Sequence, residues 1–316
     1  MHTAKVSDGT VAVRTPGWVV VDGLISLRRA VARPSARRAV PYLLVAPALL
    51  LVCILLAGVL SLAWSSLHSY DTFLGTSGKF SFTQYQQAVQ DPQFSGVLVR
   101  TMLMAALTAV VTVAFSIPFT LVLGRIRSRG LRLVLLIALF TPFLTGDVTR
   151  TFGWIVALGP HGPIHGLLHL IGVGAPTLLG TEWAIGVGIV QVTVPIVVVI
   201  LLPAVLKLDP ELEAAAMTMG APRRRVFVSV ILPQLKATGF AALAIAFALS
   251  MSSFADPLIL GEGRNDFLAN LLQDRYLNLG DAPLGAAIGI ILLILVGAGF
   301  GATLALGRVR IGRRGL

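Results

Sequence analysis

Five ionisable residues lie inside or beside long apolar stretches of this chain: Arg100, Asp147, Arg150, Glu182 and Asp256. Charged side chains are costly to place in lipid, so they usually pair with one another or face a pathway for a charged solute. Asp147 and Arg150 are three residues apart, a spacing that places them on one helix face. We expect these two residues to form an ion pair with a structural role, and a solute-binding role is the alternative.

The chemistry of a solute site would depend on the charge of its contacts. Asp147 and Asp256 could hold ammonium groups, and the rings of Phe152, Trp154 or Phe254 could add cation–π contacts. For an oxyanion, Arg150 would be the leading contact instead. The residue types leave both solute classes open.

Three histidines, His161, His165 and His169, recur every four residues. Two imidazoles at that spacing on one helix can share a metal ion. The Gly162-Pro163 pair interrupts any helix through His161, however, and no carboxylate is close in sequence. We interpret these histidines as polar side chains at a membrane surface and expect neither a metal site nor a bound cofactor.

The composition places the chain in a bilayer, since 56% of its residues are hydrophobic, only 12% are charged and the mean hydropathy is +0.87. A helix that crosses about 30 Å of hydrocarbon needs roughly 20 apolar residues. Six windows of that kind predict an all-α, polytopic protein with six transmembrane helices. They lie near residues 41–63, 97–123, 131–152, 183–206, 237–260 and 283–306.

Basic residues indicate the orientation of these spans. Segments 1–40, 124–132, 207–236 and 307–316 hold twenty of the 25 Lys and Arg residues. The positive-inside rule therefore predicts that both termini lie in the cytoplasm. Residues 1–40 are expected to form a basic cytoplasmic tail ahead of a transmembrane domain at 41–316, and the first apolar run begins too late for a cleaved signal peptide.

The segment Lys207–Lys236, "KLDPELEAAAMTMGAPRRRVFVSVILPQLK", predicts two short helices joined by a hinge. Asp209 is a good N-cap and Pro210 suits the first helical position. Gly220 can adopt the left-handed conformation that closes a helix, and Pro233 should end or kink the second helix. Such a segment could be a handle by which a soluble protein moves the spans, or an ordinary connector between them.

This segment resembles the EAA coupling loop of inner-membrane permease subunits of binding-protein-dependent ABC importers. In that family a Glu-Ala-Ala triplet precedes a glycine, and a Leu-Pro pair closes the motif thirteen residues after that glycine. Gly220 and Leu232-Pro233 keep this spacing, while Ala215 and Ala216 fill the two alanine places. The resemblance implies that the segment binds a cytoplasmic ATPase and transmits its movement.

The chain departs from the family pattern at one important position. Ala214 occupies the place of the usual glutamate, and Glu213 lies one residue earlier, about 100° away around a helix of 3.6 residues per turn. The usual polar contacts of the loop should therefore be altered. The residues that the resemblance assigns to coupling are Glu213, Ala214, Ala215, Ala216, Gly220, Ala221, Leu232 and Pro233.

Two further stretches, Asp147–Leu168 and Phe254–Gly261, resemble spermidine/putrescine-type permeases. The likeness covers roughly residues 41–306 and implies a substrate pathway for polyamines. Permeases for ferric iron, thiamine, phosphonate and sulfate share much of this layout and remain alternatives. The pathway residues taken from the likeness are Asp147, Arg150, Trp154, Phe254 and Asp256.

The resemblance implies the type I ABC importer permease (MetI-like) architecture and half of a translocation pathway that works by alternating access. The chain contains no G-x-x-x-x-G-K-[S/T] phosphate loop, so ATP and Mg²⁺ should be used by a partner. The implied partners are a cytoplasmic ABC ATPase dimer, a second permease subunit that is homologous or identical, an extracellular or periplasmic substrate-binding protein, and membrane lipid. A bacterial inner membrane is the expected location, and no nucleic acid is expected.

Two other functional classes are less consistent with the sequence. A secondary transporter or channel more often has an inverted repeat and charged relays at the membrane midplane. A membrane enzyme would need acids, histidines or serines that converge at one membrane face, and the acids here are scattered. We therefore expect a transport subunit without catalytic residues.

Overall fold

The computed structural model describes residues 34–71, 76–170 and 177–312. Of the expected basic tail, residues 1–40, the part up to residue 33 lies outside the described residues. The chain forms two units, residues 1–61 and 62–316, and each is described by itself. Helix α2 (Pro34–Ser66) contains the expected span at 41–63, and its residues up to Ser61 belong to the first unit.

The regular elements in the described part of the second unit are helices and one short antiparallel hairpin, in which β1 (His68–Asp71) pairs with β2 (Thr76–Phe80) and His68 lies opposite Phe80. The helices before the coupling segment are α3 (Thr83–Gln90), α4 (Pro92–Arg125), α5 (Arg129–Leu144), α6 (Asp147–Leu158), α7 (Pro163–Leu170) and α8 (Glu182–Leu206). The coupling segment holds α9 (Pro210–Thr218), α10 (Arg223–Val226), the π-helix η1 (Phe227–Ile231) and α11 (Leu232–Gln234). The last elements are α12 (Lys236–Met251), α13 (Ala255–Leu260), α14 (Leu268–Gln273), the π-helix η2 (Asp274–Asn278) and α15 (Ala282–Gly312).

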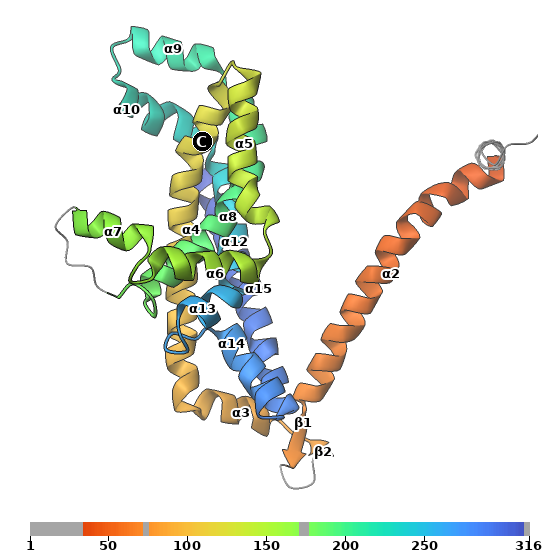
Figure 1. Cartoon of the computed structure of the whole chain (residues 1–316). Helices are drawn as coiled ribbons and strands as arrows, with labels where there is room; N and C mark the ends of the chain where they lie inside the picture. The colour runs from red at the N-terminus through yellow and green to blue at the C-terminus, as the bar shows by residue number, and fades with distance from the viewer. Residues whose placement is uncertain (1–33, 72–75, 171–176, 313–316) are drawn as a thin grey trace, which may run out of the picture. The chain divides into compact units, whose positions relative to one another are not determined.

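Four of the described helices are long and apolar enough to cross a membrane, and the number rises to six if each of two bent helix pairs counts as one span. The expected spans at 97–123, 183–206 and 283–306 lie within α4, α8 and α15. Within the second unit, α4, α8, α12 and α15 run together, with α9 and α10 at one end and α3 at the other (Figure 1).

The expected window at 131–152 is not one continuous helix. It is divided between α5 and α6, and the stretches on either side of the break make an angle of 102°. Thr145 and Gly146 adopt extended backbone with ψ angles of 134° and 146°, so neither continues the helix. Figure 1 shows α6 running across the direction of α4 as a result.

The window at 237–260 is also interrupted, because α12 ends at Met251 and α13 begins at Ala255. Pro257 has no amide hydrogen for the carbonyl of Ser253, so an uninterrupted α-helix through this region would lose a hydrogen bond. Non-helical backbone at membrane depth is tolerated where it is covered by protein or lines a cavity. The breaks between α5 and α6 and between α12 and α13 therefore indicate a candidate site where α6 meets α13.

Helices α4, α8 and α12 pack together around a buried cluster that includes Ala109, Val197 and Ala246. Small residues allow close approach between membrane helices. Thr112 and Thr193 add a buried hydroxyl–hydroxyl hydrogen bond of 2.8 Å between α4 and α8. Since α8 and α12 flank the coupling segment in sequence, this core joins that segment to the spans.

The glycines of α15 differ in how closely they approach other helices. Two glycine pairs in this helix, Gly285/Gly289 and Gly297/Gly301, have the four-residue spacing that is typical of packing faces between membrane helices. A Cβ at Gly285 would lie 2.6 Å from Tyr276 Cβ, so the first face does pack closely. A Cβ at Gly297 or Gly301 would meet no other described residue within 4 Å. A Cβ at Gly299 would meet the ring of Phe247 in α12. The face of α15 that carries Gly297 and Gly301 is therefore not in contact with another described helix of this chain.

Candidate functional site

The coupling segment begins and turns as its local sequence predicts. Asp209 Oδ1 accepts a hydrogen bond from Glu211 N at 2.8 Å and caps α9. Gly220 has a φ of +83°, Gly220 N donates to Met217 O, and Ala221 N donates to Ala216 O at 3.1 Å. These two bonds satisfy carbonyls at the end of α9 in the arrangement known as a Schellman motif. The predicted cap and hinge are confirmed.

The second half of the segment is anchored in the core. Ile231 and Leu235 are 4% and 1% exposed and belong to the cluster formed by α4, α8 and α12. The short helix α11, which contains Leu232 and Pro233, ends at Gln234. The Arg223–Gln234 stretch meets α12 at an angle of 75°. A displacement of the stretch from α10 to α11 would therefore also displace residues of α4, α8 and α12.

The outer surface of the segment is apolar and basic. Leu212, Met217 and Met219 are exposed, Met219 at 83%, and Ala214 and Ala215 are exposed beside them. The arginines at 223–225 are exposed as well. Contiguous exposed apolar side chains that are rimmed by polar ones are typical of protein-binding surfaces.

Glu213 faces the opposite way. Its two carboxylate oxygens accept hydrogen bonds from Arg125 Nη2 at 2.5 and 2.6 Å, and its side chain is only 16% exposed. Ala216, three residues later on the same face, is buried. The glutamate that is displaced by one residue from the family pattern therefore binds the end of α4.

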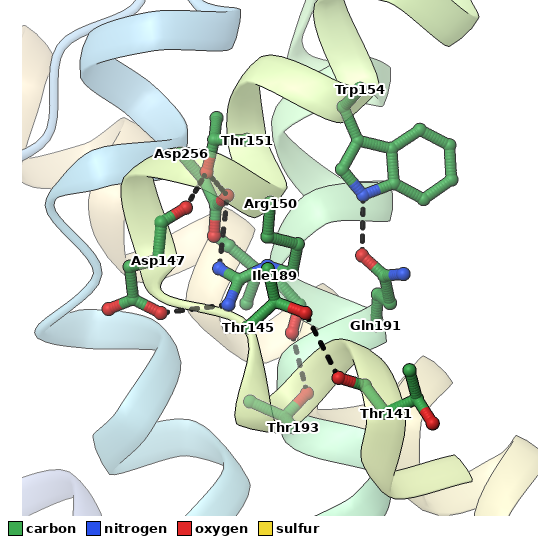
Figure 2. A network of polar contacts seen from close by, with 10 residues as sticks. All are labelled: Thr141, Thr145, Asp147, Arg150, Thr151, Trp154, Ile189, Gln191, Thr193 and Asp256. Carbon is green, nitrogen blue, oxygen red and sulfur yellow. Dashed lines mark hydrogen bonds and ion pairs between the residues drawn. The ribbon is translucent and has the colours of Figure 1, made fainter. Parts of the chain in front are cut away.

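A second candidate site is an ionic network where α6 meets α13 (Figure 2). Arg150 Nη1 donates to Asp147 Oδ1 at 2.8 Å, which confirms the ion pair expected from their spacing. Arg150 Nη2 also lies 3.6 Å from Asp256 Oδ1, and Thr151 Oγ1 donates to the same oxygen at 3.0 Å. Arg150 and Asp256 have side chains 6% and 5% exposed, whereas that of Asp147 is 71% exposed. Of the two acids, Asp147 is the accessible one.

The helix breaks position these residues. Asp147 is the first residue of α6, directly after the extended Gly146, and Asp256 lies in the first turn of α13. Asn270 Nδ2 donates to Phe254 O at 3.0 Å and holds the chain just before α13. A Cβ at Gly188 would lie 2.8 Å from Asp256 Oδ1, so only a residue without a side chain lets α8 approach this closely.

A cavity of about 420 Å³ opens beside this network. Four of the five predicted pathway residues line it: Asp147, Arg150, Phe254 and Asp256. Thr193, Ser252 and Ser253, which carry hydroxyl groups, also line it. With two carboxylates and one guanidinium, the lining has a formal charge of −1, and its size suits a small solute.

The fifth predicted pathway residue, Trp154, lies elsewhere. Its indole Nε1 donates to Gln191 Oε1 at 2.5 Å, and both line a larger apolar groove of about 620 Å³ along α4 and α8. Glu182, which also lines this groove, lies 3.4 Å from Arg100 in an ion pair. Phe152 is exposed and lines neither cavity.

Four residues that contact the predicted site residues were not predicted from the sequence: Arg125, Thr151, Gly188 and Gln191. Thr151 follows Arg150 directly and could have been found as a hydroxyl beside a charged residue. The other three act across separations of 37 to 88 residues or through the absence of a side chain. No local pattern marks contacts of that kind.

No known family model matches the chain. Among curated proteins, it is 28% identical over 220 residues to the spermidine/putrescine transport system permease protein PotB of Escherichia coli K12, which covers 69% of this chain and 79% of that protein. It is 27% identical over 266 residues to the trehalose/maltose transport system permease protein MalF of Thermococcus litoralis, which covers 81% and 89%.

Solved structures show the same fold. A chain of a bacterial alginate ABC transporter, solved in complex with its alginate pentasaccharide-bound periplasmic protein, superposes with a TM-score of 0.72 at 16% identity. The match covers 89% of this chain and 98% of that one. The helical fold and the sequence likeness are those of multi-pass permeases of ABC importers.

Proposed function

We propose that this permease subunit of an ABC importer forms half of a translocation pathway for a small polyamine cation, driven by a separate ATPase. The observation that carries the proposal is the pre-formed bent segment from α9 to α11, which has an exposed apolar and basic outer surface and an inner end anchored among the spans. On this proposal both termini and the segment lie in the cytoplasm, as the basic residues indicate.

The ATPase would bind the outer surface of α9. Exposed Leu212, Met217 and Met219 supply apolar contacts, and the arginines at 223–225 favour an acidic rim on the partner. Closure of an ATPase dimer would displace the segment and tilt α8 and α12, which flank it, so that the cavity opens to one side and then to the other. A second permease, a copy of this chain or a homologue, would complete the pathway, and an extracellular or periplasmic binding protein would deliver the solute.

The polyamine part of the proposal is supported by PotB and by the formal charge of the cavity. Asp147 has an accessible carboxylate at the cavity wall, and Phe254 lies in the same lining. An ammonium group could bind Asp147 while a methylene chain lies against the ring. Asp256, already bound to Thr151 and Arg150, would hold Arg150 in place and would not contact the solute first.

A neutral carbohydrate is the second candidate. Arg150 neutralises one of the two acids, three hydroxyl side chains line the cavity, and MalF, a permease of a sugar transport system, is among the similar proteins. Hydroxyl groups of a sugar could bind these side chains without a net charge. The two candidates differ in their dependence on Asp147.

Asp147→Asn is expected to lower the uptake of labelled spermidine by about tenfold, because a hydrogen bond to a charged group contributes roughly 1.5–3 kcal/mol. The measurement is uptake into proteoliposomes that contain the chain with its co-purified ATPase and partner subunits. The control is Asp274→Asn, the same change at an exposed acid outside the cavity. Uptake of spermidine that is unaffected by Asp147→Asn would exclude the polyamine anchor, and maltose uptake by the same vesicles would support the carbohydrate reading.

A further inference from the structure

We propose that the ion pair between Arg125 and Glu213 transmits the movement of α9 to α4, in addition to the covalent links of the segment to α8 and α12. This inference rests on the proposed ATPase coupling and goes beyond it. Arg125 is the last residue of α4, and Glu213 lies 88 residues later in α9. Among the described residues, theirs is the only ion pair that ties α9 to another element.

The geometry of the pair suits a mechanical link. One terminal nitrogen of Arg125 donates to both carboxylate oxygens of Glu213, at 2.5 and 2.6 Å. Charge-assisted hydrogen bonds are short and strong relative to neutral ones. The side chain of Glu213 is 16% exposed and that of Arg125 is 56% exposed, so the carboxylate is held on the covered side of α9 by a more accessible guanidinium. A displacement of α9 would therefore pull or push the end of α4.

The end of α4 is itself fixed to its neighbours. Arg132 Nη2 of α5 donates to Ile126 O at 2.8 Å and to Gly124 O at 3.3 Å, just past and within the last turn of α4. A Cβ at Gly124 would lie 2.9 Å from Val205 Cγ1, so α4 and α8 touch at this point. A force applied at Arg125 would thus reach α4, α5 and α8 together.

This arrangement also explains the shifted glutamate. At position 214 a glutamate would lie about 100° further around α9, on the exposed side where Ala214 is found. At position 213 it faces inward and binds Arg125. Glu213 therefore serves an internal contact, whereas Glu211 stays exposed beside the apolar and basic side chains of the outer surface.

Charge exchange tests the link. Arg125→Glu and Glu213→Arg should each reduce solute uptake per ATP hydrolysed by about tenfold, within the coupling expected for contacting residues. The double variant with both substitutions should restore at least half of the wild-type ratio, and the ATPase should co-purify with all three. The matched control is Arg127→Glu, the same charge reversal at an exposed arginine two residues from Arg125 and outside α9, and it should change the ratio less than twofold. Glu213→Gln, which preserves shape, covers the case in which a charge reversal prevents folding.

Each contrary result has a distinct meaning. Single variants and Glu213→Gln that keep the wild-type ratio would show that the pair does not transmit movement. Loss of ATPase binding by the Glu213 variants without recovery in the double variant would show that Glu213 contacts the ATPase itself. If the wild-type chain co-purified with no ATPase, the proposed function would fail before the ion pair was tested.

Discussion

Arg150→Met is expected to lower the free energy of unfolding by about 3–5 kcal/mol, the loss typical of removing one partner from a buried ion pair. Met retains most of the length and apolar volume of the side chain, but it leaves Asp256 buried without a counterion. Asp256 is 5% exposed and would keep only the hydrogen bond from Thr151. Thermal unfolding of the purified protein in detergent measures the effect.

A second substitution provides the decisive comparison. Arg150→Met combined with Asp256→Asn should recover most of the stability, because a neutral amide needs no counterion and can still accept from Thr151. Asp147→Asn should cost less than about 1 kcal/mol, since exposed ion pairs contribute little and the Asp147 side chain is 71% exposed. Equal stability of Arg150→Met and wild type, or no recovery in the double variant, would contradict the network described here.

Gly220→Val is expected to reduce the amount of co-purified ATPase by about 5- to 30-fold. The φ of +83° at Gly220 is disfavoured for residues with a Cβ by roughly 1–2 kcal/mol, and each 1.4 kcal/mol corresponds to tenfold in an equilibrium. A Cβ at this position meets nothing within 4 Å among the described residues, so the effect would come from the backbone alone. Pull-down of the ATPase with the tagged chain gives the measurement.

Gly220→Asn is the matched variant, because asparagine tolerates the left-handed conformation better than other residues with a Cβ. It should retain most of the ATPase. If valine and asparagine had equal effects, the left-handed hinge would not be what the ATPase requires.

The features that the sequence predicted correctly depend on neighbours along the chain. The cap at Asp209, the hinge at Gly220 and the ion pair of Asp147 with Arg150 each involve residues within a few positions of one another. Local preferences of this kind are present in the sequence itself. The apolar windows likewise predicted the positions of the long helices α2, α4, α8 and α15 without reference to tertiary structure.

The features that the sequence did not predict depend on how helices meet. Arg150 reaches Asp256 across 106 residues, and Arg125 reaches Glu213 across 88. A helix that is apolar on all sides has no stripe to show which face contacts a neighbour. The break between α5 and α6 was missed for a related reason, since Thr145 and Gly146 lie within an apolar run whose length alone suggested one span.

Cross-linking from position 219 tests most directly whether the segment at α9 receives an ATPase. Met219→Cys, in a chain that also carries Cys53→Ser, presents a thiol at an 83% exposed site on the outer surface. Trp183→Cys is the control, because it is 79% exposed at the opposite end of α8, roughly 35 Å away at 1.5 Å per residue. We expect a covalent adduct with the ATPase from position 219 and none from position 183. Labelling of position 219 by a membrane-impermeant maleimide added outside intact cells, or an ATPase adduct from position 183 alone, would contradict it.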